Sequence, residues 1–233
     1  MGMGNDEFFL PDNSWVYWDG LGNAPVNNYF QMVPNCGHDW GCAQDKLWEG
    51  SIGLYYSFMS GIELPKTYYK RWGGETKGKV EVRSNKPFVK ASVWQARSFP
   101  GRRDFRKSGF DWECYFQKYT DPENADPDCI EEPYYPDDYT GYTEFTDGLV
   151  TGYDDKEDFY FANYVFNMPS NSSEYFFTYF IDVELEGPLD KTTSVYRNTY
   201  KMTTLSGITP ESLPFEDCGI EEGRNCQEFC TIV

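Results

Sequence analysis

The 233-residue sequence has no apolar run that approaches the roughly 20 consecutive residues needed to cross a membrane as a helix. Basic residues are also few: 20 Lys and Arg stand against 38 Asp and Glu, and the net charge is −18. Nucleic acids and anionic membranes attract proteins through patches of Lys and Arg, so neither is expected as a partner. No Cys-x-x-Cys pair is present, so the spacing of a zinc site is missing and we expect no metal or cofactor.

Seven cysteines are nevertheless spread along the chain, and disulfides in an oxidising compartment are the better explanation for them than zinc. Plausible pairs are Cys36 with Cys42, Cys114 with Cys129, and two of the last three; buried free thiols are the alternative. Asn171 begins the sequence's single Asn-x-Ser sequon, in a polar turn with room for a glycan, although an unused sequon would look the same.

Aromatic residues make up 19% of the sequence, which indicates a folded, β-rich protein rather than a disordered acidic chain. Residues 1–64 alternate between helix and strand signals. A short helix is predicted to begin at Asn13 or Ser14, and an apolar strand is predicted within 27–35. A further amphipathic helix is predicted to end at Gly61. Its apolar face should contain the residues that recur near a 3.6-residue period: Leu47, Leu54, Tyr55 and Phe58.

From Lys66 onward the sequence favours strands, and the boundary between the two patterns falls at 64–66. About seven strands are expected, which suggests an antiparallel β-sandwich over 65–233 with a cysteine-rich tail. The clearest strand spans 175–185, where every second residue is apolar and should face the core. That face consists of Tyr175, Phe177, Tyr179, Ile181, Val183 and Leu185.

An acidic insertion interrupts the strand pattern at 121–158. Because its apolar residues show no clear periodicity, a mobile or functional loop is predicted there. Its "DPENADPDCIEE" stretch resembles a calcium loop only loosely. An EF-hand needs an oxygen ligand where Ala125 stands and a glycine where Asp126 stands. A solvated acidic loop is therefore favoured.

Asp6 and His38 are the candidate catalytic residues. They are separated by one predicted helix and one predicted strand, as are the acid and the histidine of an α/β-hydrolase triad. In such a site the histidine takes a proton from the nucleophile, and the acid fixes its tautomer and stabilises the imidazolium. A lone histidine is more often structural, so spacing alone does not establish the triad.

Three stretches of the sequence support the hypothesis of a triad: "NDEFFLPDNSWVYWDGL" (5–21), "YFQMVPNCGHDW" (29–40) and "VKASVWQARSFPGRRDFR" (89–106). Together they resemble the PhoPQ-activated pathogenicity-related protein family, whose eukaryotic members include autocrine proliferation repressor A proteins. The resemblance extends from residue 2 to about residue 112. It implies the C-terminal piece of an α/β-hydrolase-like domain followed by a β-sandwich, with Asp6 as orienting acid, His38 as general base, and secretion.

The family's nucleophile lies in a "GxSKRGW" elbow upstream of the acid, and no serine of this chain has such a setting. Ser51 comes nearest, but it lies in a predicted helix. We therefore expect residues 1–233 to be the C-terminal part of a longer protein, inactive alone. The parent would be a serine hydrolase of ester or peptide-like bonds. Alternatives are a secreted signalling or receptor-binding protein on a non-catalytic scaffold, and a β-sandwich accessory domain.

Overall fold

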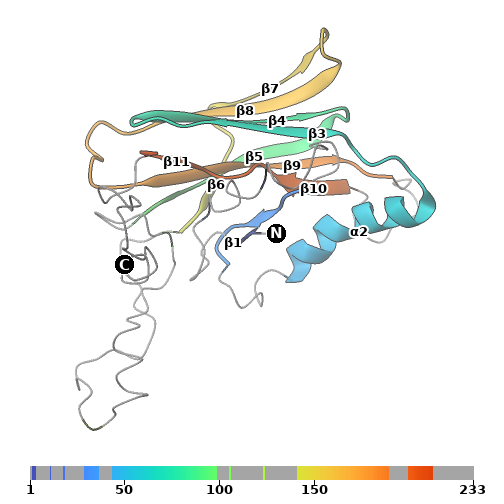
Figure 1. Ribbon diagram of the computed structural model, residues 1–233, viewed down its shortest axis with the longest axis horizontal. Helices are drawn as coiled ribbons and strands as arrows, with labels where there is room; N and C mark the ends of the chain where they lie inside the picture. Colours follow the sequence, from blue (N-terminus) through green and yellow to red (C-terminus); the bar gives the residue numbers. More distant parts are fainter. Residues whose placement is uncertain are drawn as a thin grey trace, which may run out of the picture.

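The computed structural model describes residues 2–3, 11, 18, 29–36, 44–98, 105, 123, 141–188 and 199–211 (Figure 1). Asp6 and His38 lie outside these residues, as do the predicted cysteine-rich tail and, apart from Glu123, the calcium-like stretch of the acidic insertion. Within the described part of the chain, antiparallel strands dominate, as predicted.

The first antiparallel sheet has the strand order β3-β4-β8-β7. Its strands are β3 (Thr67–Trp72), β4 (Lys77–Ser84), β7 (Leu149–Asp154) and β8 (Phe159–Asn167). Side chains alternate in and out along β4: Val80 and Val82 are fully buried, whereas Lys79, Glu81 and Arg83 line the opposite face. The period of two in "KVEVRS" thus places one apolar row in the core.

The second sheet has the order β10-β9-β5-β6, and a short strand, β11, also pairs with β9. Its strands are β5 (Phe88–Arg97), β6 (Thr143–Phe145), β9 (Phe177–Glu186), β10 (Thr199–Thr203) and β11 (Gly207–Thr209). β9 lies between β5 and β10, so most of its backbone groups are paired on both sides. A strand in this position is the most protected part of the sheet.

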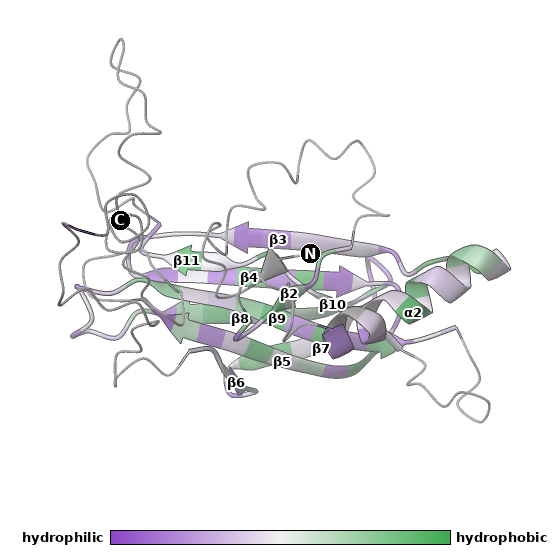
Figure 2. Ribbon diagram, turned by 90° about the horizontal axis from the view of Figure 1, so that it is seen from below, coloured by the Kyte–Doolittle hydropathy of each residue, from purple (hydrophilic) through white to green (hydrophobic). Residues whose placement is uncertain are grey.

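The main core fills the space between the two sheets, which form two layers in Figure 1. Ile181 is fully buried there, which confirms the predicted inward face of β9. The strand itself begins at Phe177, and Tyr175 precedes it as a half-buried residue that packs on this core. Green, apolar segments recur along the central strands of both sheets in Figure 2.

A second core covers the other face of β9. Phe180 is fully buried on that face, although the period-two pattern predicted only one buried face. The side chains that cover it come from distant parts of the sequence, among them Phe30, Met32, Leu205 and Ile208. Phe30 and Met32 therefore pack against the second sheet, and residues on both sides of the predicted division at 64–66 share this core.

The helix α2 (Gln44–Ser60) is closed by Gly61, as predicted. Gly61 has φ +65°, and the Gly61 and Ile62 amides donate to the carbonyls of Phe58 and Ser57, which is the Schellman pattern of helix ends. The predicted apolar face is wrong in part, because Tyr55 and Phe58 are 67% and 76% exposed.

Small residues form the buried face of α2 instead. Gly53 and Ser57 are buried against β10, and a Cβ on Gly53 would lie 2.7 Å from the carbonyl oxygen of Thr199. The helix backbone therefore approaches the strand too closely for a large side chain. Leu54 still packs against the main core beside this contact.

Two strands lie where the sequence suggested only a loop. β6 and β7 both fall within the predicted insertion 121–158. β7 pairs with β8, and β6 pairs with β5, so this end of the insertion adds an outer strand to each sheet. β6 has only three residues and β7 exposes Val150 and Tyr153, so neither shows an alternation of apolar side chains in the sequence.

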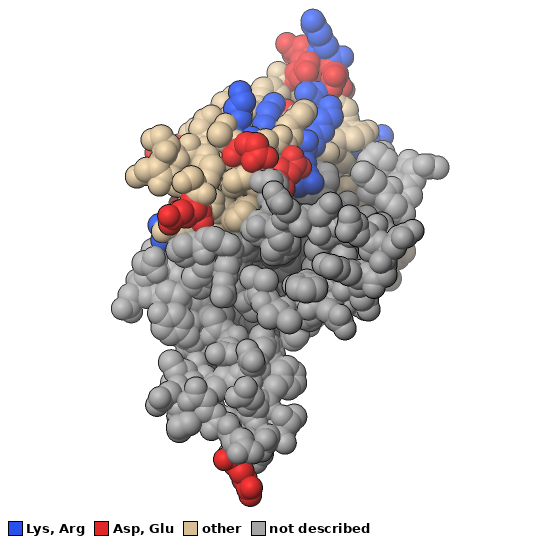
Figure 3. All heavy atoms as spheres, turned by 60° about the vertical axis from the view of Figure 1, so that its left-hand side comes forward, with Lys and Arg blue, Asp and Glu red and all other residues tan. Residues whose placement is uncertain are grey.

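Charged side chains are interspersed on the described part of one face in Figure 3. On the outer face of β4, Glu81 accepts hydrogen bonds from Lys79 at 3.0 Å and from Arg83 at 2.7 Å. Burial alone would raise the pKa of Glu81, but the hydrogen bonds from Arg83 and Lys79 outweigh it and the pKa is lowered.

No helix within the described residues is long and apolar enough to cross a membrane. The α/β-hydrolase-like piece at 1–64 and the β-sandwich as a separate domain at 65–233 stay predictions.

Candidate functional site

Two short parallel strands stand directly before the predicted acid and histidine. β1 (Gly2–Met3) pairs in parallel with β2 (Met32–Val33), with Gly2 opposite Met32 and Met3 opposite Val33. In the sequence, Asp6 follows β1 and His38 follows β2 after a few residues. The two side chains themselves lie outside the described residues, so their predicted contact stays a prediction.

β2 is held to the second sheet mainly through one residue of β10. The Thr203 amide donates to the Phe30 carbonyl at 2.8 Å, and the Thr203 hydroxyl oxygen accepts from the Met32 amide at 2.9 Å. At the start of the segment, the Tyr29 hydroxyl donates to the Pro65 carbonyl at 2.6 Å. Burial raises the pKa of Tyr29 well above its ordinary range. The segment that leads to His38 is therefore held in place at Tyr29, Phe30 and Met32.

Asn35 closes the turn after β2. Its φ is +55°, a conformation that asparagine tolerates better than most residues. Its Nδ2 donates to the Tyr142 carbonyl at 2.9 Å, and its Oδ1 accepts from the Tyr142 amide at 2.7 Å. A Cβ on Gly141 would clash with the same Oδ1, so the contact requires glycine there. Sequence reasoning missed this residue, whose only signal was an asparagine in a turn.

Cys36, beside Asn35, is 1% exposed and disulfide-bonded. The predicted pairing with Cys42 lies outside the described residues and stays a prediction. A cross-link at Cys36 limits the movement of the chain that leads to His38.

Ser51 and Ser57, two of the three serines of α2, are not placed as nucleophiles. Ser57 is fully buried, and its hydroxyl is 2.7 Å from that of Tyr200. Ser51 is exposed in the middle of the helix. A triad serine needs a strained turn between strand and helix, next to backbone amides that bind an oxyanion, and neither residue has that setting.

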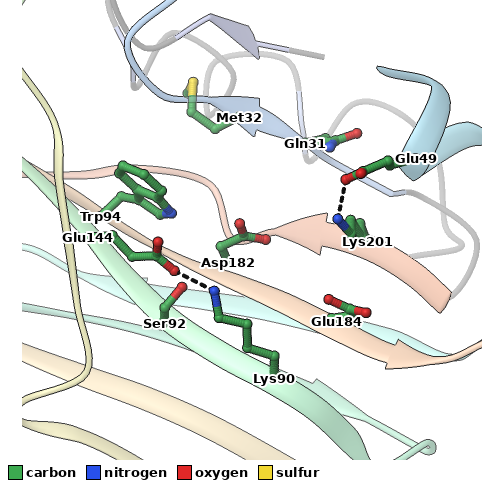
Figure 4. A pocket seen from close by; sticks show the side chains of 10 residues that line it. All are labelled: Gln31, Met32, Glu49, Lys90, Ser92, Trp94, Glu144, Asp182, Glu184 and Lys201. Atoms are coloured by element: carbon green, nitrogen blue, oxygen red, sulfur yellow. Dashed lines mark hydrogen bonds and ion pairs between the residues drawn. The ribbon is translucent and has the colours of Figure 1, made fainter. Parts of the chain in front are cut away.

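A charged pocket of about 200 Å³ lies between β2, α2 and the second sheet (Figure 4). In it Lys90 contacts Glu144 at 2.8 Å, and Lys201 of β10 forms an ion pair with Glu49 of α2. The hydrogen bond to Glu144 raises the pKa of Lys90, so Lys90 stays charged. Gln31, Met32, Ser92, Trp94, Asp182 and Glu184 complete the lining.

The pocket can hold a small polar group, because hydrogen-bonding and charged side chains converge on it. Sequence reasoning did not find it, since its lining comes from β2, α2, β5, β6, β9 and β10. The only hint was the pair of acids Asp182 and Glu184, which alternate with the apolar residues of the 175–185 strand. Among the described residues, no cluster of three or more His, Cys, Asp or Glu side chains is arranged to bind a metal ion.

Comparison with the curated proteins and with the solved structures gave no match. Comparison with family models gave one, to the PhoPQ-activated pathogenicity-related proteins, over residues 2–106. The matched range contains β1, β2, α2, β3, β4 and β5, together with Asp6 and His38. The resemblance seen in the sequence is thus confirmed: over residues 2–106, this chain has the sequence pattern of the PhoPQ-activated pathogenicity-related protein family.

Proposed function

We propose that residues 1–64 carry the acid and base of a Ser-Asp-His hydrolase site, with Asp6 orienting His38. The parallel pairing of β1 with β2 is the observation that supports it most strongly. Parallel neighbours end at the same edge of a sheet, so the segments that follow them start side by side. An acid after one strand and a histidine after the other then begin within reach of each other.

In this proposal His38 takes the proton from the attacking hydroxyl and later returns it to the leaving group. Asp6 holds the ring in the required tautomer and stabilises its charged form. Asn35 and Cys36 position the base indirectly, because they fix the turn that precedes it. The nucleophile and the oxyanion donors are contributed from outside residues 1–233, and the parent protein is an exported hydrolase of ester or peptide-like bonds.

Reaction of the chain with a fluorophosphonate probe tests whether the nucleophile lies outside residues 1–233. Residues 1–233 alone should show no labelled serine, because Ser57 is bonded in the core and Ser51 lies within a helix. A label on one serine of this chain that disappears in His38→Ala would show that the nucleophile is already present, and the proposal would be wrong.

The charged pocket supports a second candidate: a secreted binding or signalling protein, related to the proliferation repressors, that uses the hydrolase fold as a scaffold. The pocket joins β2 and α2 to the β-rich part of the chain, and pockets between such units commonly hold ligands. Here Asp6 and His38 are structural. The two candidate functions can be distinguished in the parent protein. His38→Ala abolishes the activity of a hydrolase, whereas it leaves the binding or signalling activity of a scaffold unchanged.

A further inference from the structure

The turn between β8 and β9 is anchored at both ends. At its start, the Met168 amide donates to the carbonyl of Thr76 at 2.7 Å. At its end, the Phe176 amide donates to the hydroxyl of Ser98 at 2.9 Å, and the Ser98 amide donates to the Phe176 carbonyl at 2.8 Å. The turn therefore has a defined position at the edge of the two sheets.

Inside this turn, the middle residue of the sequon points inward. Ser172 is 6% exposed, and its hydroxyl donates to the Pro169 carbonyl. Its amide also donates to Pro169, at 3.1 Å, and its carbonyl accepts from the Tyr175 amide at 3.0 Å. Asn171 and Ser173, on either side of it, are both exposed. The two residues that define an Asn-x-Ser sequon are thus presented to solvent, while the variable residue holds the turn together.

We propose that Asn171 carries an N-linked glycan. In the transfer, the side-chain nitrogen Nδ2 forms a bond to the anomeric carbon of an oligosaccharide held on a lipid pyrophosphate. The bond between that carbon and the pyrophosphate oxygen breaks, and the lipid pyrophosphate leaves with the electron pair. One amide proton is released, and no oxidation or reduction takes place. The product is an Asn-linked sugar at the tip of an exposed turn.

The folded protein accommodates this sugar without covering the charged pocket. The turn enters β9 at Phe177, whereas the pocket residues Asp182 and Glu184 lie further along the strand. α2 packs on β10, which pairs with the far end of β9, and in Figure 1 the helix and the β8–β9 connection lie at opposite ends of the sheets. A glycan at Asn171 extends into solvent at the end away from α2.

This inference rests on the proposed export of the protein, so the test supplies export independently. Residues 1–233 are expressed behind a heterologous cleavable signal peptide in a eukaryotic host. Occupancy of the peptide that contains Asn171 is measured by mass spectrometry, with and without peptide-N-glycosidase. Because transfer takes place during entry into the secretory pathway, the chain can be assayed whether it is exported or retained.

The unsubstituted chain should carry a single glycan, and the enzyme should remove it and leave Asp at position 171. Asn171→Gln and Ser173→Ala should lose the glycan, whereas Ser173→Thr, which restores the hydroxyl, should keep it. Ser172→Ala is the matched control: it removes the hydrogen bond to Pro169 but leaves the sequon intact, so the glycan should remain. An unmodified Asn171 in the chain that has entered the secretory pathway would overturn the inference, while leaving the proposed Asp6–His38 site unaffected.

Discussion

The side-chain amide of Asn35 pairs with the backbone amide and carbonyl of Tyr142, more than a hundred residues away in the sequence. The two hydrogen bonds join the turn after β2 to the segment that leads into β6. They bring together the part of the chain expected to hold the catalytic base and the part predicted to be an insertion. The packing of the turn after β2 therefore depends on the β-rich part of the protein.

Replacing Asn35 should measure the strength of this link. Asn35→Gly keeps the positive φ accessible but removes both hydrogen bonds, and should lower the free energy of unfolding by about 1–3 kcal/mol. Asn35→Ala adds the cost of a left-handed alanine, roughly 1 kcal/mol more. Urea denaturation of the three proteins gives both values. If Asn35→Gly is as stable as the unsubstituted protein, the pairing with Tyr142 contributes nothing.

A comparison of Gly141 with Gly148 tests the packing around Asn35, with Gly148 as the control. Both have positive φ, +69° and +77°. A Cβ on Gly141 would overlap Oδ1 of Asn35, whereas the nearest atom to a Cβ on Gly148 is in the Tyr164 ring, at 3.5 Å. Gly148→Ala should therefore show only the conformational cost, about 1 kcal/mol, and Gly141→Ala should be clearly less stable. Equal losses in thermal denaturation would argue against close contact at Gly141.

A charge at position 181 should be strongly destabilising. Ile181 is fully buried between the sheets, so Ile181→Lys should lower the free energy of unfolding by several kcal/mol, more than about 3. Val150→Lys is the control, because Val150 is 53% exposed on β7 and should change stability by less than about 0.5 kcal/mol. Similar stabilities of the two variants would mean that the core is assigned to the wrong face of β9.

Alkaline pH should destabilise the protein through its buried tyrosines. Burial raises the pKa of Tyr69 to about 12, against about 10 in an unfolded chain. The unfolded state loses this proton first, so the stabilising contribution is complete below pH about 10 and is lost as the pH rises towards 12. Urea midpoints between pH 8 and 12 should fall less steeply for Tyr69→Phe than for the unsubstituted protein. Parallel curves would show that Tyr69 does not titrate with unfolding.

The strands with strong local patterns could be predicted from sequence, and the features made by distant contacts could not. β9 was visible because apolar residues recur at a period of two along 175–185. The second buried face of β9 was missed because Phe30 and Leu205 cover Phe180 from remote segments. α2 was placed correctly, but its buried face was not, because glycine and serine carry no hydrophobic signal.

The same distinction between local patterns and distant contacts applies to the candidate site. Sequence order and family pattern were enough to propose Asp6 and His38, whereas Asn35 and the charged pocket depend on contacts across the whole chain. In the sequence, the pocket residues Lys90, Asp182 and Lys201 look like ordinary solvent-facing residues of three separate strands. Only the register of those strands brings them together.

Detecting a contact between Asp6 and His38 is the most direct test of the proposed function. The sequence makes the measurement simple to interpret. Because His38 is the only histidine, nitrogen NMR of the imidazole needs no assignment between residues. We expect one dominant neutral tautomer with a slowly exchanging ring N–H proton. Asp6→Ala should abolish both features, and Asp12→Ala, which removes another acid of the same segment, should leave them unchanged. An imidazole spectrum that is the same in the unsubstituted protein and in Asp6→Ala would contradict the account.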